Sequence, residues 1–272
     1  MEEAMMDGRE PAADQASDDV EERRARLYRV RGIVLRRRDL GEADRIITIF
    51  TAEQGKRRIV AKGTRRTSSK MAGHLEPFCA TRLLVARTRG LDIISQAETI
   101  EHFSDLRLNE AAIATAGYFA ELVDALLPED QAQEPIYELM YASLRLLNEG
   151  RDTRLVTHIF EMGMLRQLGY RPELARCVTC GAEIEPVLNG FSLDGGVICP
   201  GCLRVRPDVP ALSVNALKLL RAIDRGDIEQ LFWLRLPPSI WSEVGDLLTR
   251  YIERVTGRES SALRVLESLR LE

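Results

Sequence analysis

Residues 45–62 read RIITIFTAEQGKRRIVAK, and this stretch decides how the first half of the chain is interpreted. Its first seven residues are mostly β-branched, which is typical of a short strand. Gln54-Gly55-Lys56 is a turn signal, and residues 57–62 form the next strand-like run. The sequence therefore predicts a β-hairpin with basic residues at the start of its second strand.

Three further strand-like segments flank this hairpin. Alternation with a period of two begins at Tyr28 and runs to Arg37. After a polar loop at residues 63–76, residues 78–85 form another apolar run, and a turn leads into residues 91–95. Five short strands in about 70 residues fit a Greek-key barrel of the OB type, although an SH3-like barrel fits the pattern nearly as well.

The hydrophobic period changes to 3.6 residues after Leu106, which predicts helices in the rest of the chain. Prolines and glycines separate the periodic segments, and Asp152 is placed to cap one of them. The expected helices cover residues 108–127, 135–148, 152–168, 213–224, 238–256 and 261–269.

Four of the five cysteines form two CxxC pairs, Cys177 with Cys180 and Cys199 with Cys202, and 18 residues lie between the pairs. Each CxxC pair can form a tight turn, called a zinc knuckle, that directs two thiolates at one ion. Two knuckles joined by a short hairpin supply the four thiolates of a tetrahedral zinc site. Because four protein ligands leave no open position, we expect the zinc to be structural. The alternatives are redox-active CxxC motifs or unligated thiols, but no thioredoxin-like context is visible. The fifth, Cys79, is expected to be a small buried apolar residue.

The charge is distributed unevenly along the chain. Residues 1–22 carry a formal charge of -8, residues 23–107 carry +11, and residues 108–272 carry -7. A basic segment of this size attracts polyanions, whereas the alternative is an ordinary solvated surface. The acidic first segment is a candidate for screening the basic one when no ligand is bound.

Ten basic residues are the candidate nucleic-acid contacts. They fall at the end of the first strand, at the start of the third strand, and in the loop that follows it. In a small barrel we expect these places to converge on one rim and to neutralise phosphates there. Few aromatic residues accompany them, so we expect sequence-indifferent binding of single and double strands, and His74 in the same loop is a further candidate for a phosphate contact. The ten are Arg36, Arg37, Arg38, Lys56, Arg57, Arg58, Lys62, Arg65, Arg66 and Lys70.

These patterns predict a multi-domain α+β fold. An N-terminal OB-type β-barrel precedes an all-α domain that carries a four-cysteine, zinc-ribbon-like insertion. The expected parts are a disordered acidic tail at 1–25, a DNA-binding barrel at 26–105, and a helical domain at 106–272 with the zinc-binding insertion at 173–208.

Other functional classes lack support in the sequence. There is no Walker A motif and nothing resembles an assembled active site, so we expect no enzymatic activity. No apolar run approaches the ~18 residues of a membrane span, and the acidic N-terminus has no signal-peptide pattern. The expected location is the cytoplasm.

Several segments together resemble the RecO family of bacterial DNA-repair proteins. The resemblance covers most of residues 28–205, while residues 1–25 fall outside it and the helices after residue 210 match only weakly. The matching residues are Gly32–Leu35, Leu40–Asp44, Thr51–Lys56, Val60–Arg66, Leu75–Phe78, Leu168–Tyr170, the four paired cysteines, Phe191-Ser192 and Gly195-Gly196.

The resemblance implies a recombination mediator of the RecF pathway. Such proteins bind single- and double-stranded DNA, anneal complementary strands, pair with RecR, engage the C-terminal tail of single-strand-binding protein, and indirectly help to load RecA. It implies a nucleoid-associated protein whose DNA surface maps onto the ten basic residues above. A pocket for the acidic protein tail is expected in the helical part, with Arg154 and Arg166 as candidates.

Two other functions remain open from the sequence. One is an RNA-binding factor with a barrel and a zinc ribbon that acts in RNA maturation. The other is a nuclease or nucleotide-handling enzyme.

Overall fold

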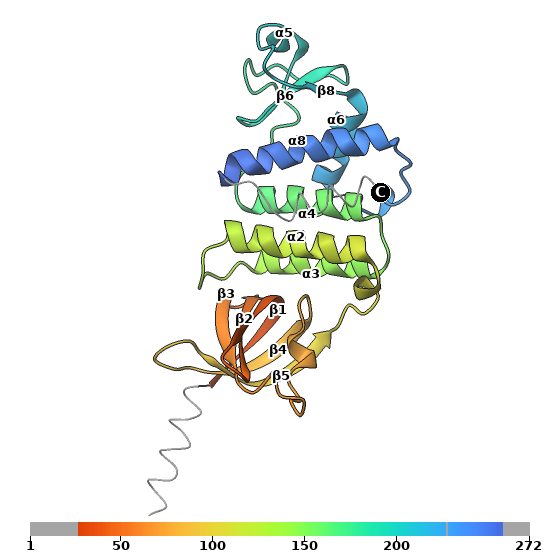
Figure 1. Cartoon of the computed structure of the whole chain (residues 1–272). Helices are drawn as coiled ribbons and strands as arrows, with labels where there is room; N and C mark the ends of the chain where they lie inside the picture. The colour runs from red at the N-terminus through yellow and green to blue at the C-terminus, as the bar shows by residue number, and fades with distance from the viewer. Residues whose placement is uncertain (1–26, 227, 258–272) are drawn as a thin grey trace, which may run out of the picture.

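The computed structural model describes residues 27–226 and 228–257, and its first part is a closed five-stranded barrel (Figure 1). The strand order is β1-β2-β3-β5-β4, and β1 pairs with both β2 and β4. β3 meets β5 in parallel where Val60 pairs with Ile93. This order is that of the OB fold, which decides against the SH3-like alternative. The strands are β1 (Leu27–Leu40), β2 (Asp44–Thr51), β3 (Gly55–Ala61), β4 (Ala80–Ala86) and β5 (Ile93–Glu101).

The long strand β1 pairs with two neighbouring strands because it bends. Its pairing with β2 shifts register between Val34 and Arg36, so its first half pairs with β4 and its second half with β2. Isoleucine, leucine and valine side chains from the strands fill the barrel. The polar loop predicted at 63–76 contains the short 3-10 helix η1 (Gly73–Leu75), whose Leu75 is buried in that barrel core.

Helices make up most of the remaining chain, as predicted. Asn109, Asp152 and Ser213 accept backbone N–H bonds at the starts of α2, α4 and α6, and Gly226 and Gly257 end α6 and α8 in left-handed conformations. The helices are α2 (Glu110–Leu126), α3 (Glu134–Asn148), α4 (Thr153–Gln167), α6 (Val214–Arg225), α7 (Ile228–Leu231) and α8 (Pro238–Thr256), after the 3-10 helix η2 (Leu106–Leu108). No helix within residues 27–226 and 228–257 is long and apolar enough to cross a membrane.

Figure 1 shows α2 and α3 lying on the barrel, with α4 and α8 as the next layer and the cysteine-bearing segment beyond them. The barrel and the first helices share one apolar core, since Phe50 of β2 packs against Tyr137 of α3 with ring centroids 6.1 Å apart. Gly55 lies so close to the α2–α3 loop that a Cβ there would be 1.9 Å from the Gln131 carbonyl oxygen. The multi-domain α+β fold is therefore confirmed, with a barrel packed directly on helices. The predicted tail at 1–25 and the helix at 261–269 lie outside the described residues.

Candidate nucleic-acid interface and metal centre

The cysteine segment folds around a small sheet of order β7-β6-β8. β6 (Asn189–Ser192) and β7 (Gly196–Ile198) form the predicted hairpin, and β8 (Ala211–Leu212) pairs with the other edge of β6. Gly196 has φ +140°, and a Cβ there would lie 2.2 Å from the Glu173 carbonyl oxygen. Glycine is therefore required where the hairpin crosses the chain that leads into the first cysteine knuckle.

The structure brings the four paired cysteines together. All four Sγ atoms of Cys177, Cys180, Cys199 and Cys202 lie within 4.8 Å of one another, and those of Cys180 and Cys199 are 3.7 Å apart. A tetrahedral site with Zn–S bonds of about 2.3 Å places its sulfur atoms about 3.8 Å apart. The donor set and its spacing therefore fit a structural metal ion.

Backbone donors prepare one of these thiols for ligation. Burial acts to raise the pKa of Cys177, but N–H groups of Cys199, Cys180 and Thr179 outweigh it and lower the pKa to about 6. The amide of Cys199 lies 3.3 Å from the Cys177 sulfur. Because a thiolate is the form that binds metal, these donors favour the ligating state.

The fifth cysteine takes no part in this cluster. Cys79 is fully buried beside β4, where its sulfur lies 3.3 Å from His102 Nδ1 and accepts from the Arg107 guanidinium at 3.3 Å. Burial raises the pKa of this thiol.

Eight of the ten predicted basic contacts divide into two sets of four, of which the first faces the helices. We define the inner set as Arg36, Lys56, Arg57 and Arg58. Lys56 is only 6% exposed, and its Nζ lies 3.0 Å from the Asp124 carboxylate and donates to the Asp124 carbonyl oxygen at 2.6 Å. Arg36 reaches the other oxygen of the same carboxylate at 3.1 Å.

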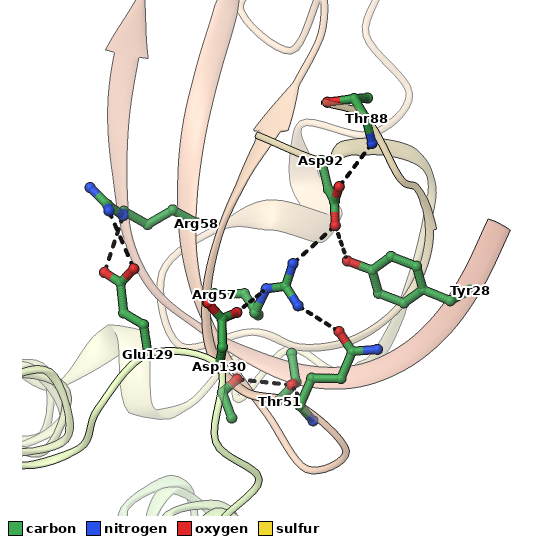
Figure 2. Close-up of polar contacts among 10 residues, drawn as sticks. Tyr28, Thr51, Arg57, Arg58, Thr88, Asp92, Glu129 and Asp130 are labelled. Atoms are coloured by element: carbon green, nitrogen blue, oxygen red, sulfur yellow. Dashed lines mark hydrogen bonds and ion pairs between the residues drawn. The ribbon is translucent and has the colours of Figure 1, made fainter. Parts of the chain in front are cut away.

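Figure 2 shows that the other two inner residues are held by carboxylates as well. Arg57 lies between Asp92 at 3.0 Å and Asp130 at 2.8 Å, and Arg58 pairs with Glu129 at 3.2 Å. Glu129 and Asp130 follow α2 in sequence, so these ion pairs join the barrel to the helical part. Sequence reasoning missed these acidic partners, although the Glu129-Asp130 pair directly after a predicted helix was a visible signal.

The second set comes from the end of β1 and from the β3–β4 loop. We define the distal rim as Arg38, Lys62, Arg66 and Lys70, all exposed, with no ion pair to any residue among 27–226 and 228–257. The neighbouring Arg65 donates to the Gly41 carbonyl at 2.7 Å, which ties the β3–β4 loop to the β1–β2 turn. The remaining candidates are also paired, Arg65 with Asp39 and Arg37 with Glu76.

The expectation that all ten residues converge on one rim is wrong. Lys56 and Lys62 lie at opposite ends of β3, and at about 3.3 Å per residue they are about 20 Å apart. The contacts around the inner set neutralise it, whereas the distal rim has no ion pair with the residues that the structure describes. Whether the ten residues touch DNA stays a prediction, and this geometry favours the distal four.

The two candidates for a protein-tail pocket lie at opposite ends of α4. At 1.5 Å per residue, Arg154 and Arg166 are about 18 Å apart. Arg154 donates to Asp152 at 2.6 Å and lies over the Trp241 ring at 5.2 Å, whereas Arg166 is exposed. Burial acts to raise the pKa of Asp152, but hydrogen bonds from Arg154 outweigh it and hold the pKa below its ordinary value.

Comparisons with known proteins match both halves of the chain. The family model described as Recombination protein O N terminal matches residues 26–103, and the one described as Recombination protein O C terminal matches residues 108–264. A protein named DNA repair protein RecO from a Roseiflexus species is 38% identical over 248 residues, which cover 91% of this chain and 87% of that relative. A protein of the same name from Symbiobacterium thermophilum is 38% identical, over 90% of this chain and 98% of that relative. Another from Dehalococcoides mccartyi is 35% identical, over 89% of this chain and 96% of that relative.

Proposed function

The chain belongs to the RecO family of DNA-repair proteins, and on this premise we propose that it is a non-catalytic recombination mediator that binds single- and double-stranded DNA and anneals complementary strands. The distal rim is the observation that carries this proposal. Four exposed cations from the end of β1 and the β3–β4 loop offer phosphates a binding surface, and none has a carboxylate partner among the described residues. Screening of two strands by the same cations lowers their mutual repulsion, so pairing proceeds without ATP.

The partners follow from the family. We propose that the protein acts with RecR, engages the C-terminal tail of single-strand-binding protein, and indirectly assists RecA loading on DNA in the cytoplasm. Of the two tail-pocket candidates, the geometry favours Arg166, because Asp152 already occupies the guanidinium of Arg154.

The cysteine cluster is proposed to hold one structural Zn²⁺. Cys177, Cys180, Cys199 and Cys202 would be its ligands, and a closed set of four thiolates stabilises the local fold without supplying a reactive site. The ion would fix the hairpin and both knuckles to each other.

Strand annealing is the experiment that tests the mediator role. Complementary oligonucleotides would be annealed with and without a coat of single-strand-binding protein, using the wild type and R38Q/K62Q/R66Q/K70Q. The matched control changes four exposed cations of the helical part, Arg204, Lys218, Arg235 and Arg250, to Gln.

We expect the distal-rim variant to lose annealing while the control retains it. Equal loss in both variants would contradict the proposal, because net charge alone would then explain the activity. Competition between single-stranded DNA and RNA of the same length, at fixed salt, decides against the RNA-maturation alternative if DNA binds as well as or better than RNA. Cleavage of a labelled oligonucleotide in Mg²⁺ or Mn²⁺ would contradict the non-catalytic role.

A further inference from the structure

A groove of about 540 Å³ crosses the outer wall of the barrel. The residues lining it come from β1, β4, β5, η1 and the loop before η1. Figure 1 places β4 and β5 on the part of the barrel away from α2 and α3. The groove therefore lies outside the contact between barrel and helices, and it contains none of the inner set.

Strand register explains how basic and apolar groups meet in this groove. Arg29 of β1 pairs with Leu84 of β4, which in turn pairs with Gln96 of β5. Arg82, two residues before Leu84, lies on the same outer face and is a diagonal neighbour of Arg29. Two guanidinium groups thus flank a half-buried leucine side chain.

The 3-10 helix η1 and the loop before it supply the second wall. Lys70, Met71 and His74 line the groove opposite β4 and β5. Met71 also packs against the barrel core, so the groove is lined by this apolar side chain as well as by Leu84. The Nδ1 atom of His74 is engaged with Thr99 Oγ1 at 2.7 Å, which fixes the ring against β5.

The charge in the groove is positive. Arg29 and Lys70 are exposed and have no ion pair within residues 27–226 and 228–257. Glu98 is the carboxylate among the lining residues, and it pairs with Arg82 at 3.2 Å. The side chains of Arg82 and Glu98 are 53% and 73% exposed, so this pair is weak and a phosphate can replace the carboxylate at little cost.

We propose that this groove binds a single nucleic-acid strand, with phosphates at Arg29, Arg82 and Lys70 and a base against Leu84 and Met71. The inference rests on the proposed function and deepens it by naming a second site and its preferred form of nucleic acid. Single strands expose their bases to an apolar floor, whereas a duplex keeps its bases stacked inside and offers mainly phosphates. Lys70 belongs to both the distal rim and the groove, so one strand passes from the rim into the groove.

Binding to two probes tests the proposal. Fluorescence anisotropy would compare an oligo-dT strand with a hairpin duplex of the same phosphate number, using the wild type and R29Q/R82Q. The control is R87Q/R89Q, which removes the same charge from exposed arginines of the β4–β5 loop. We expect R29Q/R82Q to weaken oligo-dT binding about 10-fold, to flatten its salt slope by about 1.4, and to change hairpin binding less than twofold.

A gain-of-affinity variant keeps the test independent of folding. Glu98→Gln removes the competing carboxylate, so oligo-dT affinity should rise about threefold, whereas Glu229→Gln on α7 should leave it unchanged.

The outcomes separate the groove from the mediator role. The groove proposal is overturned if the wild type binds oligo-dT and R29Q/R82Q binds it with the same affinity as the control R87Q/R89Q. It is also overturned if R29Q/R82Q loses as much affinity for the hairpin duplex as for oligo-dT. In both cases the proposed function stands. A wild type that binds neither probe overturns the proposed function itself.

Discussion

Replacing either partner of the Lys56–Asp124 pair should destabilise the whole fold and leave DNA affinity almost unchanged. The Lys56 side chain is only 8% exposed, and its ammonium contacts both the carboxylate and the carbonyl oxygen of Asp124. Asp124→Ala leaves that ammonium buried with one remaining oxygen partner. Lys56→Met leaves Asp124 paired with Arg36 at 3.1 Å, and the side chain of Asp124 is 31% exposed.

These differences set the magnitudes. Loss of one partner from a buried pair costs about 3–5 kcal/mol, and the partial exposure of Asp124 favours the lower end for Asp124→Ala, about 3 kcal/mol. We expect about 1–2 kcal/mol for Lys56→Met, because water and Arg36 still satisfy the carboxylate. At about 2–4 °C per kcal/mol, Asp124→Ala should lower the Tm by about 6–12 °C.

Scanning calorimetry of both single variants and of the double variant K56M/D124L measures these changes. The double variant should recover part of the loss, since an apolar pair replaces a buried ion pair without leaving either charge alone. Parallel DNA titrations over a range of salt concentrations should give K56M the wild-type slope.

One result would refute this reasoning. If K56M keeps the wild-type Tm while its salt slope for single-stranded DNA becomes flatter by about 0.7, Lys56 contacts a phosphate. The division between the inner set and the distal rim would then be incorrect.

Three other changes have defined outcomes. Elemental analysis should find one zinc per chain, and Cys199→Ser should lose the metal and melt earlier; a metal-free wild type that is equally stable would contradict the structural role. R38Q/R66Q should flatten the salt slope on single-stranded DNA by about 1.4, and an unchanged slope would remove these two residues from the interface. Asp152→Ala should cost about 1 kcal/mol in urea unfolding at pH 7, because the α4 cap is lost. The pKa of Asp152 is lower in the folded state than its ordinary value near 3.8. The stability that the charged carboxylate gives is therefore fully present above pH 3.8 and is lost as the pH falls through the folded-state pKa. If the difference in unfolding free energy between wild type and Asp152→Ala grew in acid, this sign would be contradicted.

Local patterns in the sequence predicted the cysteine cluster and all five barrel strands, although the fifth runs over Ile93–Glu101 and not over residues 91–95. The hairpin of residues 45–62 depends on neighbouring residues, so periodicity and turn residues predict it. The two CxxC pairs predict the metal site for the same reason. The cysteines of each pair are close in sequence, and one hairpin joins the two pairs.

The sequence alone could not show which basic residues belong to the inner set and which to the distal rim. Lys56 and Asp124 are 68 residues apart, and only the packing of β3 against the end of α2 and the α2–α3 loop brings them together. In the charge count of the sequence, Lys56 and Lys62 are equivalent, but in the fold Lys56 is buried and Lys62 is exposed. Charge segregation thus predicted a basic barrel, but which of its cations remain available depends on tertiary contacts.

The Lys56–Asp124 contact has a consequence for the order of events during protein synthesis. The lysine leaves the ribosome 68 residues ahead of its aspartate, which at about 5–20 residues per second is a delay of about 3–14 s. The barrel strands end at Glu101, 23 residues before Asp124, so a completed barrel waits about 1–5 s before it can bury the β3 ammonium with its partner. We therefore expect the nascent β3 edge to stay hydrated and open until α2 has emerged, so that the barrel matures only when the first helix docks.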